Sequence, residues 1–233
     1  DGHAYVADDF IRQSVIALLR FADQEVWAVG GPLVHDAKTP TGKAIGLAMS
    51  HPLGVGNAHH RDPNFEGFGE GTNFPAMYRW VFDRIGMYDE TLVRNQDDEL
   101  YFRLRQAGGK FFITPKISYV YFVREKLGQL FRQYYQYSFW RIPVMLKHRQ
   151  PTTLRQIVPS LFYLMMFAGI VAGACLSSAW VAFALPAIYI SALFFVGLSL
   201  LPKLGASIAM RVPLAIVTMH AGYAWGMIHG WSC

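Results

Sequence analysis

The stretch Gln96–Pro115, QDDELYFRLRQAGGKFFITP, carries the signals of a helix followed directly by a short strand. Asp97 or Asp98 can cap a helix through DELYFRLRQA, with Leu100 and Leu104 on its inner face. Two consecutive glycines end that helix, and the apolar run KFFIT that follows is typical of a buried strand. The stretch therefore predicts one helix-to-strand unit of an α/β fold.

The residues before this unit repeat the alternation of helix and strand. Residues 25–30 (EVWAVG) predict a buried strand, and residues 76–85 (AMYRWVFDRI) predict a helix. A further helix is expected in FIRQSVIALLRF at 10–21, preceded by Asp8 and Asp9 as possible caps. We expect its inner face to consist of Ile11, Val15, Leu18 and Leu19. This alternation favours an α/β sandwich.

The charged residues are distributed very unevenly along the 233 residues. Hydrophobic residues make up 53% and charged residues 16% of the chain, against about 25% charged in a typical domain. Beyond residue 155 the only charged side chains are Lys203 and Arg211. This pattern excludes a disordered chain and a simple soluble globule. Two cysteines, Cys175 and Cys233, exclude a disulfide scaffold.

The C-terminal third has the composition of membrane-spanning helices. Since a span needs about 20 apolar residues, the uncharged run from 156 to 202 is long enough for two. We expect spans at 157–177 and 180–201, separated by a short break at Ser177 and Ser178, and a third at 212–231. A buried hairpin in a soluble core is the alternative, but nothing else in the chain is large enough to cover it.

Basic residues orient these expected spans. Lysines and arginines concentrate before the first span and recur between the second and third, whereas the break near Ser178 has none. The positive-inside rule then places the front half in the cytoplasm, Ser178 outside and 202–211 in a cytoplasmic loop. His220 and His229 in the third span are functional groups, partners of a neighbouring helix or residues near the membrane surface.

The segment 121–155 differs from both neighbours because it is basic and amphipathic. Apolar residues recur there at helical spacing, and the net charge is +6. Such a helix is expected to lie on an anionic cytoplasmic leaflet. A nucleic-acid-binding patch is the disfavoured alternative directly before membrane spans. The apolar positions are Leu127, Leu130, Phe131, Tyr134 and Tyr137.

Three acidic segments are candidates for chemistry. Asp1 and His3 are close enough along the chain to bind one divalent ion. The acidic run at 97–99 either provides a general base at a loop–helix junction or simply stabilises a helix N-terminus. GMYDE at 86–90 is a turn that ends the preceding helix.

Other histidines and glycines give weaker signals. His35, His51, His59 and His60 match no structural zinc spacing, and no cysteine lies near them. The segment 54–56 (GVG) is a poor phosphate loop because no helix signature follows it. A loop on the acceptor side of a binding site is the favoured interpretation.

Taken together and in this order, these segments resemble the inverting family 2 glycosyltransferases of the GT-A fold. The similar branch is the bacterial exopolysaccharide enzymes of the succinoglycan-biosynthesis type. Asp1 and His3 match the metal-binding Asp-x-Asp position, and SHPLGVGNAHHR (50–61) resembles a Gly-Val-Gly segment of that branch. GMYDE (86–90) matches the Gly-x-Phe-Asp-Glu turn. QDDELYFRLRQAGGK (96–110) matches the Glu-Asp-x-Asp/Glu-Leu-x-x-Arg-Leu-x-x-x-Gly signature.

The resemblance covers residues 1 to about 150 and implies a domain plan. Residues 1–120 would be the C-terminal portion of a Rossmann-like GT-A catalytic domain, 121–155 a membrane-interface segment and 156–233 the transmembrane helices. The nucleotide-binding first half of such enzymes is not in this sequence, so we expect these residues alone to be inactive. The implied location is the bacterial inner membrane, multi-pass, with the catalytic part in the cytoplasm.

The resemblance also implies a reaction and its residues. A sugar would pass from a nucleotide donor, expected to be a UDP-sugar, to a lipid-linked glycan acceptor, with Asp97 as general base and no role for nucleic acid. Asp1 and His3 would hold Mn²⁺ or Mg²⁺ against the leaving diphosphate. The implied catalytic residues are Asp97, Asp98 and Glu99, and the implied substrate-binding residues are Gly71, Phe74, Tyr78, Arg79, Gln133 and Arg141.

Two departures from the family pattern keep alternatives open. Gln96 stands where the family usually has Glu, which leaves a catalytically inactive, membrane-tethered binding module as one alternative. A processive polysaccharide synthase is the other. Such synthases carry Gln-x-x-Arg-Trp on the interfacial helix, and residues 133–141 (QYYQYSFWR) do not match it. A single-addition enzyme is therefore favoured.

Overall fold

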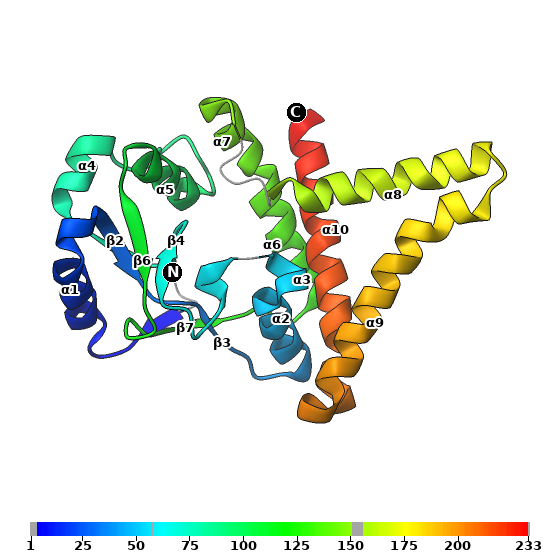
Figure 1. The fold of residues 1–233 in the computed structure, drawn as a ribbon, viewed down its shortest axis with the longest axis horizontal. Helices are drawn as coiled ribbons and strands as arrows, with labels where there is room; N and C mark the ends of the chain where they lie inside the picture. The colour runs from blue at the N-terminus through cyan, green and yellow to red at the C-terminus, as the bar shows by residue number, and fades with distance from the viewer. Residues whose placement is uncertain (1–3, 57, 151–155, 233) are drawn as a thin grey trace. The chain divides into compact units, whose positions relative to one another are not determined.

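The computed structural model describes residues 4–56, 58–150 and 156–232. The chain divides into two compact units, shown in Figure 1. The α/β unit comprises residues 1–36 and 55–123, and the helical unit comprises 37–54 and 124–233. Residues 37–54 lie within the range predicted for the catalytic portion, but they pack with the helical unit.

A four-stranded mixed sheet forms the centre of the α/β unit, in the order β4-β6-β2-β5. β2 (Val26–Gly30) is buried along its whole length and pairs in parallel with β6 (Lys110–Ile113). β4 (Gly67–Gly69) and β5 (Ala76–Met77) pair antiparallel with β6 and β2. The strands predicted at 25–30 and 110–114 are confirmed. The helix predicted at 76–85 is wrong in its first turn, because residues 76 and 77 pair with β2.

A second sheet of three short strands completes the α/β unit. β7 (Tyr119–Phe122) lies between β1 (Ala4–Val6) and β3 (Val34–Asp36), antiparallel to the first and parallel to the second. Tyr119 is one of the largest fully buried side chains of the chain. The sheet therefore places this tyrosine in the interior of the unit.

The helices of the α/β unit cover the four-stranded sheet with two apolar clusters. α4 (Arg79–Ile85) and α5 (Gln96–Gln106) pack on Trp27 and Phe111, and α1 (Phe10–Arg20) packs on Val29 and Phe112. One-turn 3-10 helices occur at Ala22–Gln24 and His59–Arg61.

The helix at α1 is confirmed, but the inner face predicted for it is right only at Leu18 and wrong at Ile11, Val15 and Leu19. Ile11 is 76% exposed and Leu19 is 67% exposed, whereas Ser14, Ala17 and Leu18 are buried. Leu18 and Ala17 pack with Phe10 and Phe21 against the sheet. The Ser14 hydroxyl donates to the carbonyl of Phe10, so a polar side chain is accommodated on the buried face.

The helical unit is built from α2 and from the helices that follow residue 124. α6, α7 and α10 pack together, and α2 lies against α10, α9 and α6. The bounds are α2 Pro40–Ser50, α3 Pro52–Val55, α6 Leu127–Phe139, α7 Arg141–His148, α8 Val158–Cys175, α9 Ala179–Ala209 and α10 Arg211–Ser232.

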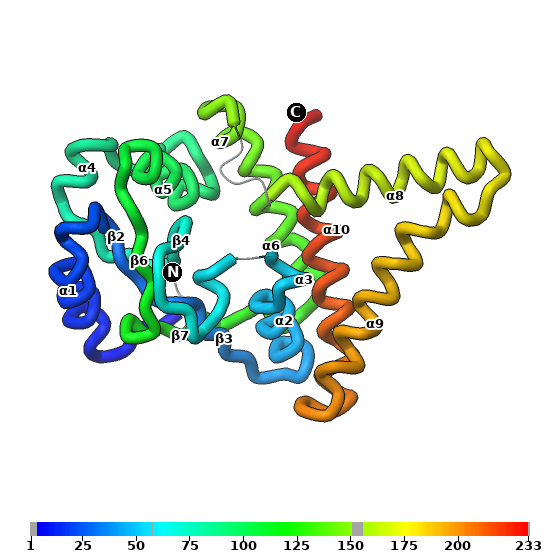
Figure 2. Tube along the Cα trace, in the orientation of Figure 1, coloured from blue at the N-terminus to red at the C-terminus, as the bar shows by residue number. Residues whose placement is uncertain are grey.

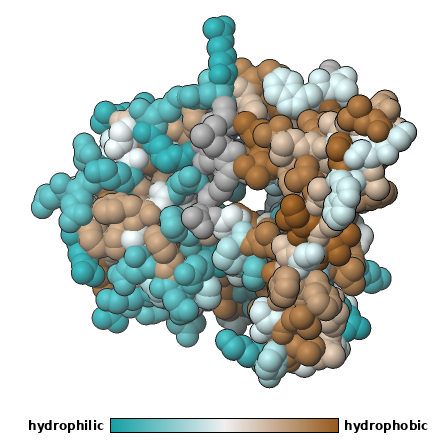
Figure 3. All heavy atoms as spheres, turned by 45° about the vertical axis from the view of Figure 1, so that its right-hand side comes forward, coloured by the Kyte–Doolittle hydropathy of each residue, from teal (hydrophilic) through white to brown (hydrophobic). Residues whose placement is uncertain are grey.

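Among the described residues, two helices are long and apolar enough to cross a membrane, namely α8 and α9. Figure 2 traces them and the turn between them, which contains Ser177 in a left-handed conformation (φ 51°). In Figure 3, hydrophobic residues gather over the helical unit. The loop predicted at 202–211 is wrong, because α9 continues through Pro202 and Lys203 to Ala209 and departs from helical geometry at Gly205.

α10 coincides with the third predicted span and is the packing centre of the helical unit. Three glycines spaced by four residues, Gly222, Gly226 and Gly230, place its backbone against α6. A Cβ at Gly222 would stand 2.6 Å from the Phe131 carbonyl oxygen, and one at Gly230 would stand 3.0 Å from that of Phe139. Small residues at this spacing allow two helix backbones to approach closely.

The two histidines of α10 bind neighbouring helices, which confirms the pairing alternative. His220 lies 2.8 Å from the Tyr189 hydroxyl of α9, and its other ring nitrogen lies 3.3 Å from the Gly54 carbonyl oxygen. His229 pairs with the Tyr135 hydroxyl of α6. These contacts join α9 and α6 to α10.

Glu125 fixes the start of α2 to the segment that leads into α6. Its carboxylate accepts hydrogen bonds from the backbone amides of Lys38 (2.8 Å) and Thr39 (3.2 Å) and from the Thr39 hydroxyl. Thr39 in turn caps α2 by accepting from the Gly42 amide at 3.0 Å. The hydrogen bonds from Thr39 and Lys38 lower the pKa of Glu125.

We expect Gly226→Ala to destabilise the helical unit by about 1–3 kcal/mol, because the added methyl has no room against the Tyr135 carbonyl and Ser138. Thermal unfolding of the complete protein in detergent measures this change. Gly128→Ala is the matched control, because a Cβ there meets nothing within 4 Å and alanine favours a helix. Equal losses in the two variants would contradict tight packing at Gly226.

Candidate functional site

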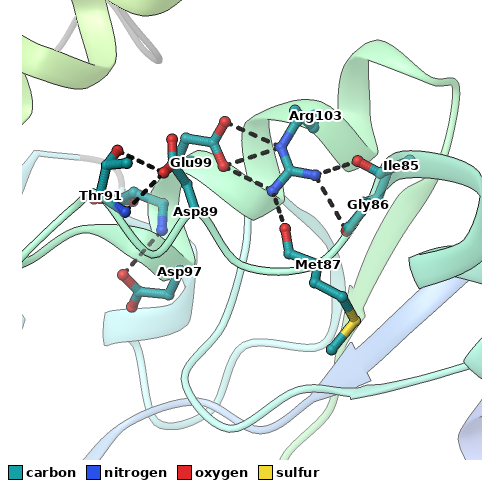
Figure 4. Close-up of polar contacts among 9 residues, drawn as sticks. Ile85, Gly86, Met87, Asp89, Thr91, Asp97, Glu99 and Arg103 are labelled. Atoms are coloured by element: carbon teal, nitrogen blue, oxygen red, sulfur yellow. Dashed lines mark hydrogen bonds and ion pairs between the residues drawn. The ribbon is translucent and has the colours of Figure 1, made fainter.

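The Arg103 side chain organises the loop that precedes α5. Its guanidinium makes a bidentate ion pair with the Glu99 carboxylate, with nitrogen–oxygen distances of 2.8–3.0 Å. The same group donates to the carbonyl oxygens of Ile85, Gly86 (3.1 Å) and Met87 (2.7 Å). Figure 4 shows these bonds converging on one guanidinium. Because Glu99 is fully buried, it is placed as a support of the loop.

The remainder of the loop is fixed by its own side chains. The Asp89 carboxylate accepts from the amide (3.0 Å) and hydroxyl (2.6 Å) of Thr91. The Gln96 amide donates to the Leu92 carbonyl at 2.6 Å. A glutamate, which is the family's usual residue at position 96, could not donate this bond in its ionised form. Gln96 therefore has a structural use in this chain.

Asp97 lies exposed in the first turn of α5. The helix begins at Gln96, preceded by Asn95 in a left-handed conformation (φ 62°), and no described side chain caps it. The predicted cap by Asp97 or Asp98 is therefore wrong. The Asp97 carboxylate accepts from the Asp98 amide at 2.9 Å. Its position at the positive end of the helix stabilises the ionised form.

Two tyrosine hydroxyls lie in the electrostatic field of Asp97. Burial, and next the Asp97 carboxylate, raise the pKa of Tyr88 and of Tyr101. The ring of Tyr101 also covers Gly71, where an added Cβ would stand 2.7 Å from it. Tyr101 therefore contacts Gly71, one of the residues predicted to bind substrate, and also lies in the electrostatic field of Asp97.

Sequence reasoning missed these tyrosines, although a signal was present. Tyr101 follows Asp97 by four residues, so the two share one face of α5. Tyr88 lies in the GMYDE turn that the Arg103 guanidinium fixes. Since aromatic residues at helical spacing are usually core residues, the pattern alone did not single out their hydroxyl groups.

The other residues predicted to bind substrate in the α/β unit have different environments. Phe74 is partly exposed, with φ 50°, and its ring meets Tyr119 edge-on at 5.4 Å. Arg79 is exposed at the start of α4. Tyr78 packs between the two apolar clusters, and its hydroxyl donates to the Leu18 carbonyl at 3.0 Å. The presence of tyrosine at position 78 is therefore explained by packing.

The remaining predicted residues lie elsewhere. Gln133 and Arg141 belong to the helical unit, where both are buried and Gln133 donates to the Tyr137 hydroxyl at 2.8 Å. Asp1 and His3 lie outside the described residues. Within the part of the chain that the structure describes, no group of three or more potential ligands could hold a metal ion. In the α/β unit the structure places Gly71 against the ring of Tyr101, which lies one helical turn after Asp97 on α5.

We expect Arg103→Gln to destabilise the protein by about 3 kcal/mol, because it leaves the Glu99 carboxylate buried without its cation. The loop at 86–95 should also become sensitive to proteolysis. Unfolding midpoints together with mapped protease cleavage sites measure both effects. Arg94→Gln is the control, since Arg94 is exposed and makes no ion pair with a described residue. Unchanged stability and cleavage in Arg103→Gln would contradict this role.

With this geometry established, comparison with known proteins identifies two informative relatives. The chain is 34% identical over 164 residues to the succinoglycan biosynthesis protein ExoA of Rhizobium meliloti (strain 1021), covering 68% of this chain and 47% of ExoA. It is 21% identical over 232 residues to a dolichyl N-acetyl-alpha-D-glucosaminyl phosphate 3-beta-D-2,3-diacetamido-2,3-dideoxy-beta-D-glucuronosyltransferase of Methanococcus voltae, covering 98% of this chain and 68% of that protein.

The chain spans about half the length of ExoA. No family model matches the chain, and no solved structure matches it. The names of the two relatives agree with the glycosyltransferase resemblance that the motifs at 86–90 and 96–110 carry. This chain is therefore similar to a succinoglycan biosynthesis protein and to a glycosyltransferase.

Proposed function

We propose that the complete protein transfers a single sugar from a nucleotide-sugar donor to a glycan acceptor, with inversion at the anomeric carbon. The observation that carries this proposal is the exposed Asp97 carboxylate at the start of α5, beside a loop that the buried Glu99–Arg103 pair holds in place. The names of the two relatives support sugar transfer and exopolysaccharide assembly as its setting.

Asp97 is the general base of the proposed reaction. Its carboxylate takes the proton of an acceptor hydroxyl as the hydroxyl oxygen forms a bond to the anomeric carbon. The bond from that carbon to the donor's diphosphate breaks on the opposite face, which inverts the configuration. A positioned base of this kind contributes about 10²–10⁴ in rate. Asp98 and the Tyr88 and Tyr101 hydroxyls would bind sugar hydroxyls around Asp97.

A divalent ion is part of the proposal. Asp1 and His3 supply a carboxylate and an imidazole, a donor set that fits Mn²⁺ and also Mg²⁺. The ion would offset negative charge on the diphosphate that leaves. Asp1 and His3 lie outside the described residues, so their assignment as metal ligands rests on the sequence motif.

Attachment to the membrane defines the proposed acceptor. α8 and α9 have the length and composition of spans, and we propose that α10 crosses the bilayer with them. The basic segment 121–155 would then lie on the cytoplasmic leaflet of a bacterial inner membrane. An acceptor glycan carried by a lipid would be held at this surface, and a UDP-sugar would be the donor.

We expect Asp97→Asn to lower sugar transfer by about 10²–10⁴ while leaving the fold intact. Release of nucleoside diphosphate, from a panel of sugar nucleotides with a lipid-linked acceptor present, measures transfer in membranes that contain the complete protein. The control is Asp83→Asn, a substitution that removes the same charge from an exposed carboxylate of α4. Full activity in Asp97→Asn would overturn the assignment of the base.

We expect a chelator to abolish this release and added Mn²⁺ to restore it, because the leaving diphosphate would lose its counter-charge. His3→Ala should raise the Mn²⁺ concentration needed for half-maximal activity, and His148→Ala should leave it unchanged. Full activity in the chelator would exclude a divalent ion from the reaction.

A further inference from the structure

The turn that follows α2 is closed by hydrogen bonds within itself. The His51 amide donates to the Ala48 carbonyl at 3.3 Å, and the Gly54 amide donates to the His51 carbonyl at 2.8 Å. The Leu53 amide donates to Nδ1 of the His51 ring at 3.1 Å. Position 54 has room only for glycine, because a Cβ there would stand 2.2 Å from the Ala48 carbonyl oxygen. Residues 48–54 therefore form a compact turn with little freedom of its own.

His220 of α10 holds this turn from a second helix. Its Nε2 lies 3.3 Å from the Gly54 carbonyl oxygen, and its Nδ1 lies 2.8 Å from the Tyr189 hydroxyl of α9. A carbonyl oxygen can only accept, so Nε2 carries the proton of the ring and the Tyr189 hydroxyl donates to Nδ1. Both ring nitrogens are thereby used, and the hydrogen bonds run from α9 through α10 to the turn.

The Tyr189 ring extends this connection to α8. It stacks on the His220 ring with centroids 6.0 Å apart, and it meets the Phe162 ring of α8 at 5.2 Å. α2, which leads into the turn, lies against α10 and α9 (Figure 1). The turn is therefore connected to α8 and α9, the two described helices that are long and apolar enough to cross a membrane.

The His51 ring presents an N–H donor that the turn itself does not use. Because Nδ1 accepts from the Leu53 amide, this nitrogen carries no proton, and the proton of the neutral ring is on Nε2. Burial lowers the pKa of His51, which favours the neutral ring at neutral pH. The side chain is partly exposed, and its Nε2 makes no hydrogen bond with a described residue. The donor is thus available to a ligand and is fixed in direction by the turn.

We propose that His220 and Tyr189 are positioning residues that hold the turn 48–54, and that the Nε2–H of His51 donates to a hydroxyl oxygen of the acceptor glycan. This inference rests on the proposed function and deepens it, because it names a contact to the acceptor in the helical unit. A lipid-linked acceptor would be held by its lipid along α8 and α9 and by its glycan at His51.

The first test measures the position of the turn without catalysis. Hydrogen–deuterium exchange of the peptide that contains residues 48–56 is followed in the complete protein in detergent. We expect this peptide to exchange about 5-fold faster in His220→Leu and in Tyr189→Phe, because each variant removes a hydrogen bond that holds the turn. His220→Gln should restore the wild-type rate, since its side-chain amide can donate to Gly54 and accept from Tyr189.

His229→Leu is the matched control for the first test. His229 belongs to the same helix and also pairs with a tyrosine, but that tyrosine, Tyr135, lies on α6. Exchange of residues 48–56 should be unchanged in this variant. An equal rise in His229→Leu would overturn the positioning role, because the effect would then be a general loosening of α10. Unchanged exchange in folded His220→Leu and Tyr189→Phe would also overturn it.

The second test assigns the His51 donor to the acceptor. His51→Asn keeps an oxygen that can accept from the Leu53 amide but has no N–H at the position of Nε2, so it separates the donor from the turn. In the assay of nucleoside diphosphate release, we expect it to raise KM for the lipid-linked acceptor by about 3–10-fold. KM for the sugar nucleotide and kcat should be unchanged.

The positioning variants should show the same dependence on the acceptor. His220→Leu should raise KM for the acceptor, His220→Gln should return it to the wild-type value, and His229→Leu should change neither KM. Unchanged KM for the acceptor in His51→Asn would overturn the contact with the glycan. An equal rise of KM for the sugar nucleotide would overturn it as well, because the effect would then not be specific to the acceptor.

The two proposals fail separately. A wild type whose turn responds to His220→Leu in the exchange experiment, but that transfers no sugar, would retain the positioning role and overturn the proposed function. A wild type that transfers sugar, with KM for the acceptor unchanged in folded His51→Asn and His220→Leu, would retain the proposed function and overturn the acceptor contact.

Discussion

The buried ion pair between Glu99 and Arg103 is the interaction on which the candidate site depends. A carboxylate with no exposed surface can remain ionised only beside a cation, and Arg103 provides it one helical turn away. Because a guanidinium has five N–H donors, the same side chain also binds the carbonyls of residues 85–87. One pair thereby fixes a helix and the loop before it.

This arrangement explains why neighbouring acidic residues have different roles. Glu99 points into the unit and supports the loop, whereas Asp97, two positions earlier, is exposed at the helix N-terminus. Residues two apart on a helix point in different directions, and here one of them faces the interior and the other faces solvent. The helix dipole then favours the ionised form of the exposed member, which is the form a general base requires.

Local pattern predicted the buried strand β2, the helix–strand unit of α5 and β6, and the two long apolar helices. The local pattern gave wrong predictions where contacts with residues distant in sequence determine the structure. The inner face of α1 depends on Phe10 and Phe21 meeting the sheet, and apolar spacing alone also selected Ile11, Val15 and Leu19, which are exposed. Ala76 and Met77 form a strand only because β2 lies beside them. Tyr101 lies one helical turn from Asp97, but its contact with Gly71 joins residues distant in sequence, which no local spacing records.

The helix α10 shows why an uncharged stretch does not by itself determine its surroundings. Residues 212–231 contain three glycines at intervals of four, which give one side of the helix a smooth surface that α6 covers. Apolar side chains on such a helix are satisfied equally by lipid or by another helix, since neither offers hydrogen bonds. Composition therefore does not decide between lipid and protein as the neighbour of α10. The positions of the glycines determine which face meets α6, because they allow the α6 backbone to approach closely.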